Sequence, residues 1–177
     1  MPEEIEVPTE HLHEKMEEEA EHGGRWVMRV AVSSAILAVA AAISALYAGG
    51  FANQAILEEM QATDKWAYFQ AKGIKANVGQ SKIDTLAALG KPITKEDAAQ
   101  IEQYKQEQGA IEKEAHALEE DSEAHMQQHE QIARAVTLFQ IAIAMGAISV
   151  LAKKQQLWFI SLGLGAAGLY FMGVGLL

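Results

Sequence analysis

The sequence predicts an all-α membrane protein with three transmembrane helices and a long antiparallel helical hairpin, coiled-coil-like, between the first two. Two observations predict it. Charged side chains and histidine are absent from residues 30–57, 135–152 and 155–177, stretches of 28, 18 and 23 residues. The segment between the first two stretches is polar and carries a heptad pattern of apolar residues. A soluble enzyme with a single core is therefore excluded.

Charge and hydropathy agree with this division. The 177-residue chain has a net charge of −10 and a mean hydropathy of −0.01. That average combines apolar membrane segments with strongly acidic hydrophilic ones. A nucleic-acid-binding protein needs a basic patch, which this acidic chain lacks in sequence, so nucleic acid is not expected as a partner. Cysteine is absent, which excludes disulfides and thiolate metal ligands.

The three uncharged stretches have the length of transmembrane helices. A bilayer core of about 30 Å needs about 20 mostly apolar helical residues. The predicted division is an acidic His/Glu-rich N-terminal segment at 1–25, transmembrane helix 1 at 26–50, an extramembrane helical hairpin at 51–131 with its turn near 90–94, transmembrane helix 2 at 132–152 and transmembrane helix 3 at 155–177.

Basic residues next to the spans predict the orientation. Arg25, Arg29, Lys153 and Lys154 all lie on one side, because an even number of spans separates them. Lys and Arg in short loops favour the cytoplasmic side. We therefore expect the N-terminus in the cytoplasm, with the hairpin and the C-terminus on the other side of the membrane.

The hairpin is predicted from a turn signal and a heptad pattern. Gly90 and Pro92 break the first helix, and Thr94 with Asp97 resembles a capping box that starts the second. Apolar or small residues then recur three and four apart, a pattern typical of a coiled coil. The positions are Ile101, Tyr104, Gln108, Ile111, Ala115, Leu118, Ser122, His125, His129, Ile132, Val136 and Phe139.

The first arm of the hairpin has a poorer seam. We expect it at Met60, Ala67, Ala71, Ile74, Val78, Ser81, Thr85 and Ala88. Such small residues bury little apolar area. Trp66, Tyr68 and Phe69 cannot all share one face, so their burial calls for neighbouring chains. We therefore expect a homo-oligomer in which hairpins pack together.

The block Trp66-Ala67-Tyr68-Phe69-Gln70-Ala71-Lys72 resembles the signature of a bacterial family of membrane proteins, the domain of unknown function 4337. The Glu/His-rich leader ending at Arg25-Trp26 and the Ala-rich first span are also similar to that family, and the resemblance covers nearly the whole chain. It implies a bacterial inner-membrane protein with three spans and a helical insert. With the orientation predicted from the flanking charges, the hairpin and the C-terminus are then expected in the periplasm. It implies no activity, substrate or catalytic residue.

A histidine pair in the second arm is the main candidate for metal chemistry. His125 and His129 lie four residues apart on one helix face, opposite Glu58 and Glu59 in an antiparallel hairpin. Two imidazoles and a carboxylate suit a divalent cation such as zinc or iron. The alternative is structural: the pair sets the register of the hairpin or bonds to the facing Glu and Gln54. A pH-dependent hairpin is also conceivable.

Small residues in the spans predict helix packing. Ser161, Gly165, Gly168 and Gly175 form one stripe in the third span, and Ala142 with Gly146 forms another in the second. Such stripes let helices approach closely in lipid. Gly163, Gly165 and Gly168 also spell G-x-G-x-x-G, but a dinucleotide site needs a strand before that motif, so this reading is rejected.

These observations favour a non-enzymatic membrane protein without a cofactor, which forms a structural or interaction assembly with copies of itself in the bilayer and with other envelope proteins. No ionisable residue lies at membrane depth, which disfavours a proton-coupled transporter. One alternative is an oligomeric channel or pore lined by Gln140. The second alternative is a metal- or pH-sensing membrane assembly.

Overall fold

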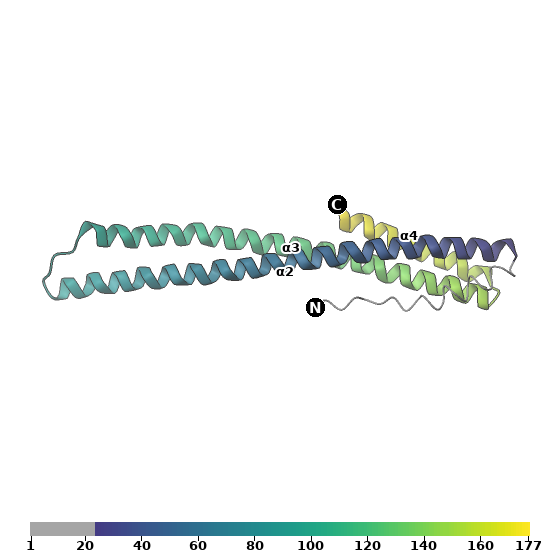
Figure 1. Ribbon diagram of the computed structural model, residues 1–177, viewed down its shortest axis with the longest axis horizontal. Helices are drawn as coiled ribbons and strands as arrows, with labels where there is room; N and C mark the ends of the chain where they lie inside the picture. The colour runs from purple at the N-terminus through teal and green to yellow at the C-terminus, as the bar shows by residue number, and fades with distance from the viewer. Residues whose placement is uncertain (1–23) are drawn as a thin grey trace. The chain divides into compact units, whose positions relative to one another are not determined.

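The computed structural model describes residues 24–177, which form three helices and no strand. The helices are α2 (Arg25–Ala88), α3 (Lys95–Leu151) and α4 (Gln155–Leu176) (Figure 1). The predicted acidic segment at 1–25 lies almost wholly outside the described residues. Each helix contains a stretch long and apolar enough, by length and composition, to cross a membrane. The described chain is therefore all-α, as expected.

The chain divides into two compact units. Asn53–His125 forms one of them, called here the hairpin unit. The segment up to Ala52 joins Met126–Leu177 to form the other, called here the three-helix unit. Both α2 and α3 contribute to both units, because neither helix ends at the boundary.

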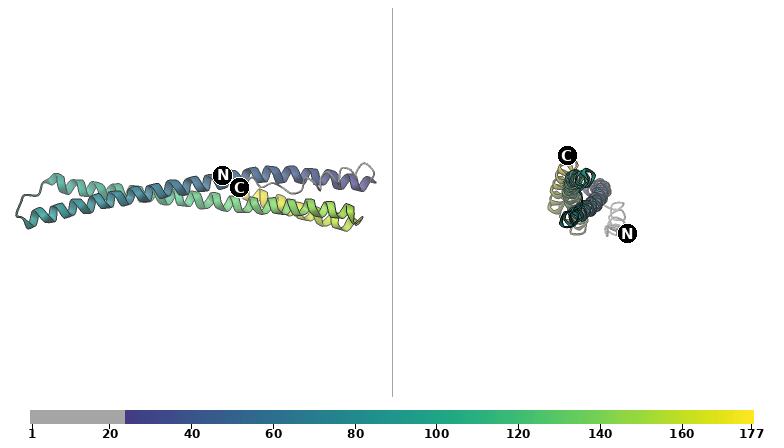
Figure 2. Two further views of the ribbon diagram at one scale, coloured as in Figure 1. Left: turned by 60° about the horizontal axis from the view of Figure 1, so that its bottom comes forward. Right: turned by 90° about the vertical axis from the view of Figure 1, so that its left-hand side faces the viewer.

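In the hairpin unit, α2 and α3 run antiparallel and pack closely (Figures 1 and 2). The α3 face expected from the heptad pattern is confirmed. Its positions are buried at Ile101, Ile111, Ala115 and Ser122 and half-buried at the remaining heptad positions of this unit. This burial follows from the 3.5-residue repeat, which keeps one helical face toward the partner.

The seam expected on α2 was wrong. Met60, Ile74 and Val78 are 62%, 63% and 65% exposed. A different face of α2 meets α3. Its buried residues are Ala55, Ala62 and Ala76. Its half-buried residues are Glu58, Lys65, Phe69, Lys72, Gly79, Ile83 and Leu86. The error has a physical cause: charged side chains occupy seam positions and bond across the hairpin, so a search for apolar residues passes over this face.

The turn of the hairpin uses Gly90 and Thr94. Gly90 has a φ of 64°, a conformation open to glycine without strain, and the N–H of Lys91 donates to the carbonyl of Leu86 to close the end of α2. The Thr94 hydroxyl accepts from the Asp97 N–H at 3.2 Å and donates to the Asp97 carboxylate at 2.7 Å. The expected cap of the second arm is therefore confirmed.

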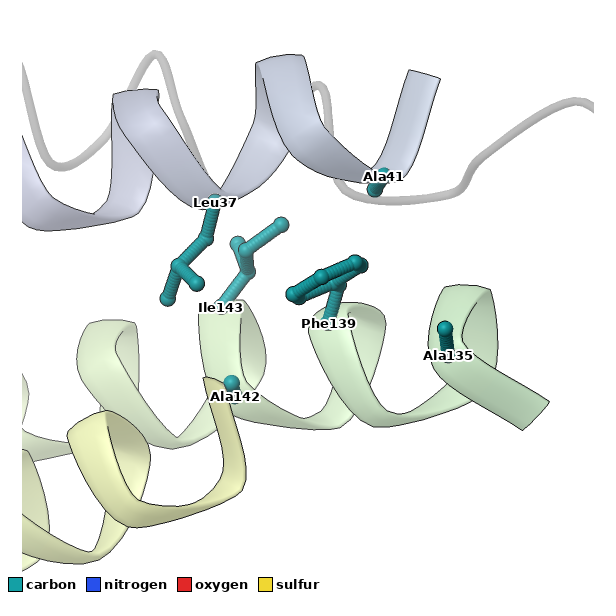
Figure 3. Packing of buried hydrophobic residues seen from close by; sticks show 6 residues of the cluster. All are labelled: Leu37, Ala41, Ala135, Phe139, Ala142 and Ile143. Atoms are coloured by element: carbon teal, nitrogen blue, oxygen red, sulfur yellow. The ribbon is translucent and has the colours of Figure 1, made fainter. Parts of the chain in front are cut away.

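The core of the three-helix unit lies around Phe139. Its ring is fully buried, between Leu37 and Ala41 of α2 and residues Ala135, Ala142 and Ile143 of its own helix (Figure 3). Leu164, Phe171 and Met172 of α4 pack against the same cluster. One large ring among alanines allows three helices to pack closely, and van der Waals packing of this kind holds helices together in lipid.

Candidate functional site

The Trp-Ala-Tyr-Phe-Gln-Ala-Lys block lies on α2 of the hairpin unit and bonds across to α3. The Trp66 indole N–H donates to the Glu119 carboxylate at 2.7 Å, and the His116 Nδ1 lies 2.8 Å from the other oxygen of that carboxylate. The Trp66 ring stands edge-on to His116, with centroids 5.1 Å apart. The Trp66 bond, and secondly the His116 bond, hold the pKa of Glu119 below its usual 4.5. Glu119 is therefore kept as a charged acceptor.

One turn and a half further along α2, Lys72 forms the second half of the same contact. Its ammonium is ion-paired with Glu107 and lies over the rings of Tyr68 and Tyr104, at 5.1 and 5.3 Å from their centroids. The bond to Glu107 raises the pKa of Lys72 and, in turn, the Lys72 bond lowers the pKa of Glu107. Both groups are thus held in their charged forms. Lys72 is half-buried, so the aliphatic part of its side chain packs between the two helices.

The cross-hairpin bonds of Lys65, Trp66, Phe69 and Lys72 on α2 with Glu107, Gln108, Glu114 and Glu119 on α3 are called here the polar clamp. Together they favour one register of the hairpin. Lys65 and Lys72 stand seven residues apart and pair with Glu114 and Glu107, which stand seven apart in the opposite direction. The Gln108 side-chain amide also donates to the Phe69 carbonyl at 3.2 Å. A slip of one heptad would keep only one lysine–glutamate pair, Lys72 with Glu114 or Lys65 with Glu107, and would break the bond between Gln108 and Phe69.

Sequence reasoning missed the polar clamp. We expected Trp66, Tyr68 and Phe69 to need neighbouring chains, but Trp66 and Phe69 pack edge-on against each other at 5.5 Å and are half-buried within one chain. Tyr68 is 51% exposed, with its ring against Lys72. The matching seven-residue spacings of lysine on one arm and glutamate on the other are the signal that could have found it.

The histidine pair is divided between two environments. In the hairpin unit, the His125 Nδ1 lies 2.7 Å from Glu58, as the antiparallel pairing predicted, and both are half-buried. In the three-helix unit, the His129 Nδ1 lies 2.8 Å from the Ala48 carbonyl oxygen. A carbonyl oxygen only accepts, so this Nδ1 carries the proton and donates it. The structure thus gives each imidazole a partner from α2.

Within residues 24–177, no group of three or more His, Asp or Glu side chains could hold a metal ion. Glu59, the fourth predicted ligand, is exposed. The divalent-cation site at His125, His129, Glu58 and Glu59 therefore stays a prediction, with the Glu58–His125 contact as its support. Charge-assisted bonding of that pair across the hairpin serves the structural alternative equally well.

The small residues predicted to pack in the third apolar stretch form the buried face of α4. Ser161, Gly165, Gly168 and Gly175 are the buried residues of α4. A Cβ added at Gly165 would lie 2.6 Å from Leu37 of α2, and one added at Gly175 would lie 2.5 Å from Ile132 of α3. Both helices thus approach α4 at glycines.

The C-terminal part of α3 contributes Ala142 and Gly146 to the same packing. The Ala142 carbonyl accepts a bond from the Ser161 hydroxyl at 2.6 Å, and a Cβ added at Gly146 would lie 2.9 Å from the Ser34 hydroxyl oxygen. The predicted pore-lining residue, Gln140, is half-buried on α3. Its role in lining a pore stays a prediction.

The geometry defines a class of protein: an all-helical chain with three helices able to cross a membrane and a helical hairpin held by interhelical polar bonds. The family described as domain of unknown function (DUF4337) matches residues 26–177. The chain belongs to this family, as its Trp-Ala-Tyr-Phe-Gln-Ala-Lys block indicated. No curated protein and no solved structure matches the chain.

Proposed function

We propose that the chain is an integral, non-enzymatic membrane protein that assembles with copies of itself through the outer face of α2. The observation that carries the proposal is an exposed apolar stripe in the hairpin unit. Its large members are Leu57, Met60, Ile74 and Val78, which are 54% to 65% exposed, with Ala67 and Ala71 between them. This set is called here the outer stripe.

The outer stripe has the spacing of a helix–helix contact. Its members recur three and four residues apart, opposite the face that meets α3, and Asp64 alone interrupts them. Apolar residues at this spacing on a hydrophilic hairpin favour burial against another helix. The part after Asp64, residues 67–78, is continuous and is the centre of the proposed contact.

Charge supports a second copy on this face and opposes one on α3. Within the hairpin unit, α3 carries ten acidic residues and three lysines, whereas α2 carries four of each sign. Two α3 surfaces would repel each other, and two α2 surfaces would not. Copies anchored in the same bilayer also share one orientation, so like helices can meet side by side.

The proposed location is the bacterial inner membrane, with the N-terminus and the α3–α4 turn in the cytoplasm and the hairpin in the periplasm. The basis is the flanking charge of Arg25, Arg29, Lys153 and Lys154. A C-terminal alkaline phosphatase fusion should be active in the periplasm. A fluorescent C-terminal GFP fusion with a silent phosphatase would contradict this orientation.

Two glutamate substitutions in the outer stripe test the assembly. Ile74→Glu with Val78→Glu should convert the detergent-solubilised oligomer to monomer in light scattering, because each copy would bury two carboxylates at the contact. Gln70→Glu with Asn77→Glu is the matched control: it adds the same two charges at exposed positions of α2 outside the stripe. A monomeric wild-type protein, or an oligomer that survives the double substitution, would refute the proposal.

The two alternatives predicted from the sequence rest on less. A pore needs a lumen between copies that reaches Gln140, and its test is conductance in planar bilayers. A metal- or pH-sensing assembly rests on the contact between His125 and Glu58, and its test is elemental analysis of the purified protein. The outer stripe favours the structural assembly over both.

A further inference from the structure

Basic residues gather at one end of the three-helix unit. Val27 and Val30, in the first two turns of α2, pack against Ala147 and Val150, in the last two turns of α3. The start of α2 and the α3–α4 turn therefore lie at the same end of this unit (Figure 1). This end carries four exposed cations, called here the basic end: Arg25, Arg29, Lys153 and Lys154.

The described part of the unit offers these cations no acidic partner. The acidic residue in the described part of this unit is Glu130, and its carboxylate lies 3.5 Å from the Arg134 guanidinium. That pair is about five helical turns away from Lys153 along α3. Salt bridges from the basic end to described residues are likewise absent. Four positive charges therefore face outward together, and a ligand of opposite charge is the expected complement.

Two tryptophans place the basic end at the depth of lipid headgroups. Trp26 and Trp158 both pack on the valine–alanine cluster at this end. The Trp158 indole N–H donates to the Ser33 hydroxyl at 3.1 Å, so its polar edge is satisfied while one ring face stays against apolar neighbours. Tryptophan in this setting favours the boundary between hydrocarbon and headgroups. Lys153 and Lys154 lie about one turn beyond Trp158 and Arg25 adjoins Trp26, so these cations stand level with phosphates. Arg29 lies one turn inward from Trp26, and its long side chain can extend back to that level.

The backbone at the α3–α4 turn adds further donors. Lys153 has a φ of 55°, and the N–H groups of Lys153 and Lys154 close the end of α3 by bonding to Val150 and Ser149. The next helix begins at once, and no side chain caps its first turn. Open N–H groups in a first helical turn complement a phosphate that the lysines hold.

We propose that the basic end binds the headgroup phosphate of an anionic phospholipid. Arginine can hold two phosphate oxygens in parallel bonds, and lysine acts as a point charge, so the two residue types together suit a phosphodiester. The proposal rests on the proposed membrane location. Residues 1–24, with nine glutamates and one lysine, are attached directly before Arg25, so lipid must compete with these carboxylates.

Native mass spectrometry of the full-length chain tests the lipid site. The protein is exchanged into detergent with equal amounts of phosphatidylglycerol and phosphatidylcholine. Wild-type protein should retain phosphatidylglycerol preferentially. Arg29→Gln with Lys154→Gln should lower that preference by roughly 25-fold, at about fivefold for each cation near the surface. Arg29→Lys with Lys154→Arg, which keeps both charges, should restore it.

The controls separate the possible causes. Arg134→Gln removes a cation that pairs with Glu130 away from the basic end, and it should leave the preference unchanged. Excess inorganic phosphate should not displace the lipid; displacement would show that the site takes free phosphate and would overturn the proposal. Equal retention of both lipids by wild-type protein would also overturn it. Carbonate extraction of native membranes tests the membrane location separately, because a protein released by carbonate fails the proposed function itself.

Discussion

Gly168 provides the sharpest test of how α4 packs. A methyl group added there would lie 2.7, 2.8 and 3.1 Å from three carbons of the Phe139 ring, and that ring is fully buried. Gly163 lies on the same helix, and nothing stands within 4 Å of the methyl group that alanine would add. A Cβ has room at Gly163 and no room at Gly168, which makes Gly163→Ala the matched control for Gly168→Ala.

The magnitude follows from two opposing terms. Overpacking a buried site costs about 1–3 kcal/mol. Alanine in place of a helical glycine stabilises by about 0.5–1 kcal/mol, and this term is common to both variants. The free energy of unfolding should therefore be about 1–3 kcal/mol lower for Gly168→Ala than for Gly163→Ala. For a chain of this size, 1 kcal/mol corresponds to a change in Tm of roughly 2–4 °C.

Thermal unfolding in detergent, followed by circular dichroism, measures the difference. Gly163→Ala should unfold at or above the wild-type Tm, and Gly168→Ala should unfold below it. Equal Tm values for the two variants would mean that Phe139 does not confine Gly168, and the packing of α4 described above would be refuted.

Two further predictions concern the polar clamp. Trp66→Phe keeps the aromatic ring but removes the N–H that bonds to Glu119, so the Tm of the detergent-solubilised protein should fall and the pKa of Glu119 should rise toward 4.5; an unchanged Tm would count against the clamp. The second prediction concerns pH. Because the pKa values of Glu107 and Glu119 are lowered in the folded state, their stabilisation is complete above the ordinary value of 4.5 and is lost as the pH falls through the lowered values. The Tm should therefore decline below pH 4.5, and the decline should be smaller in Glu119→Gln; a pH dependence identical to wild type would contradict this assignment.

The all-α class and the α3 seam could be predicted because each depends on local pattern. Uncharged stretches of about 20 residues predict helices of membrane length whatever surrounds them. The α3 seam is visible because large apolar residues such as Ile101 and Ile111 repeat along it, and both are buried. The helix cap at Thr94 could also be predicted, because it is formed by two residues only three positions apart, Thr94 and Asp97.

The α2 face could not be predicted in the same way. Ile74 and Val78 are larger than Ala62 and Ala76, yet these alanines take buried positions while Ile74 and Val78 are exposed. The choice between two faces depends on which partners α3 presents, and Glu107 decides it by pairing with Lys72. Apolar size alone does not separate the two faces, because each carries both large apolar residues and alanines.

The sequence alone therefore determined the helical class, the three stretches long and apolar enough to cross a membrane, the α3 seam and the family. Each of these depends on residues close together in the chain. Only the tertiary structure decided which face of α2 meets α3, that Trp66 belongs to a clamp within one chain, and that the first turns of α2 lie beside the α3–α4 turn. Those features depend on contacts between residues far apart in sequence, whose energies are set by the partner as well as by the residue itself.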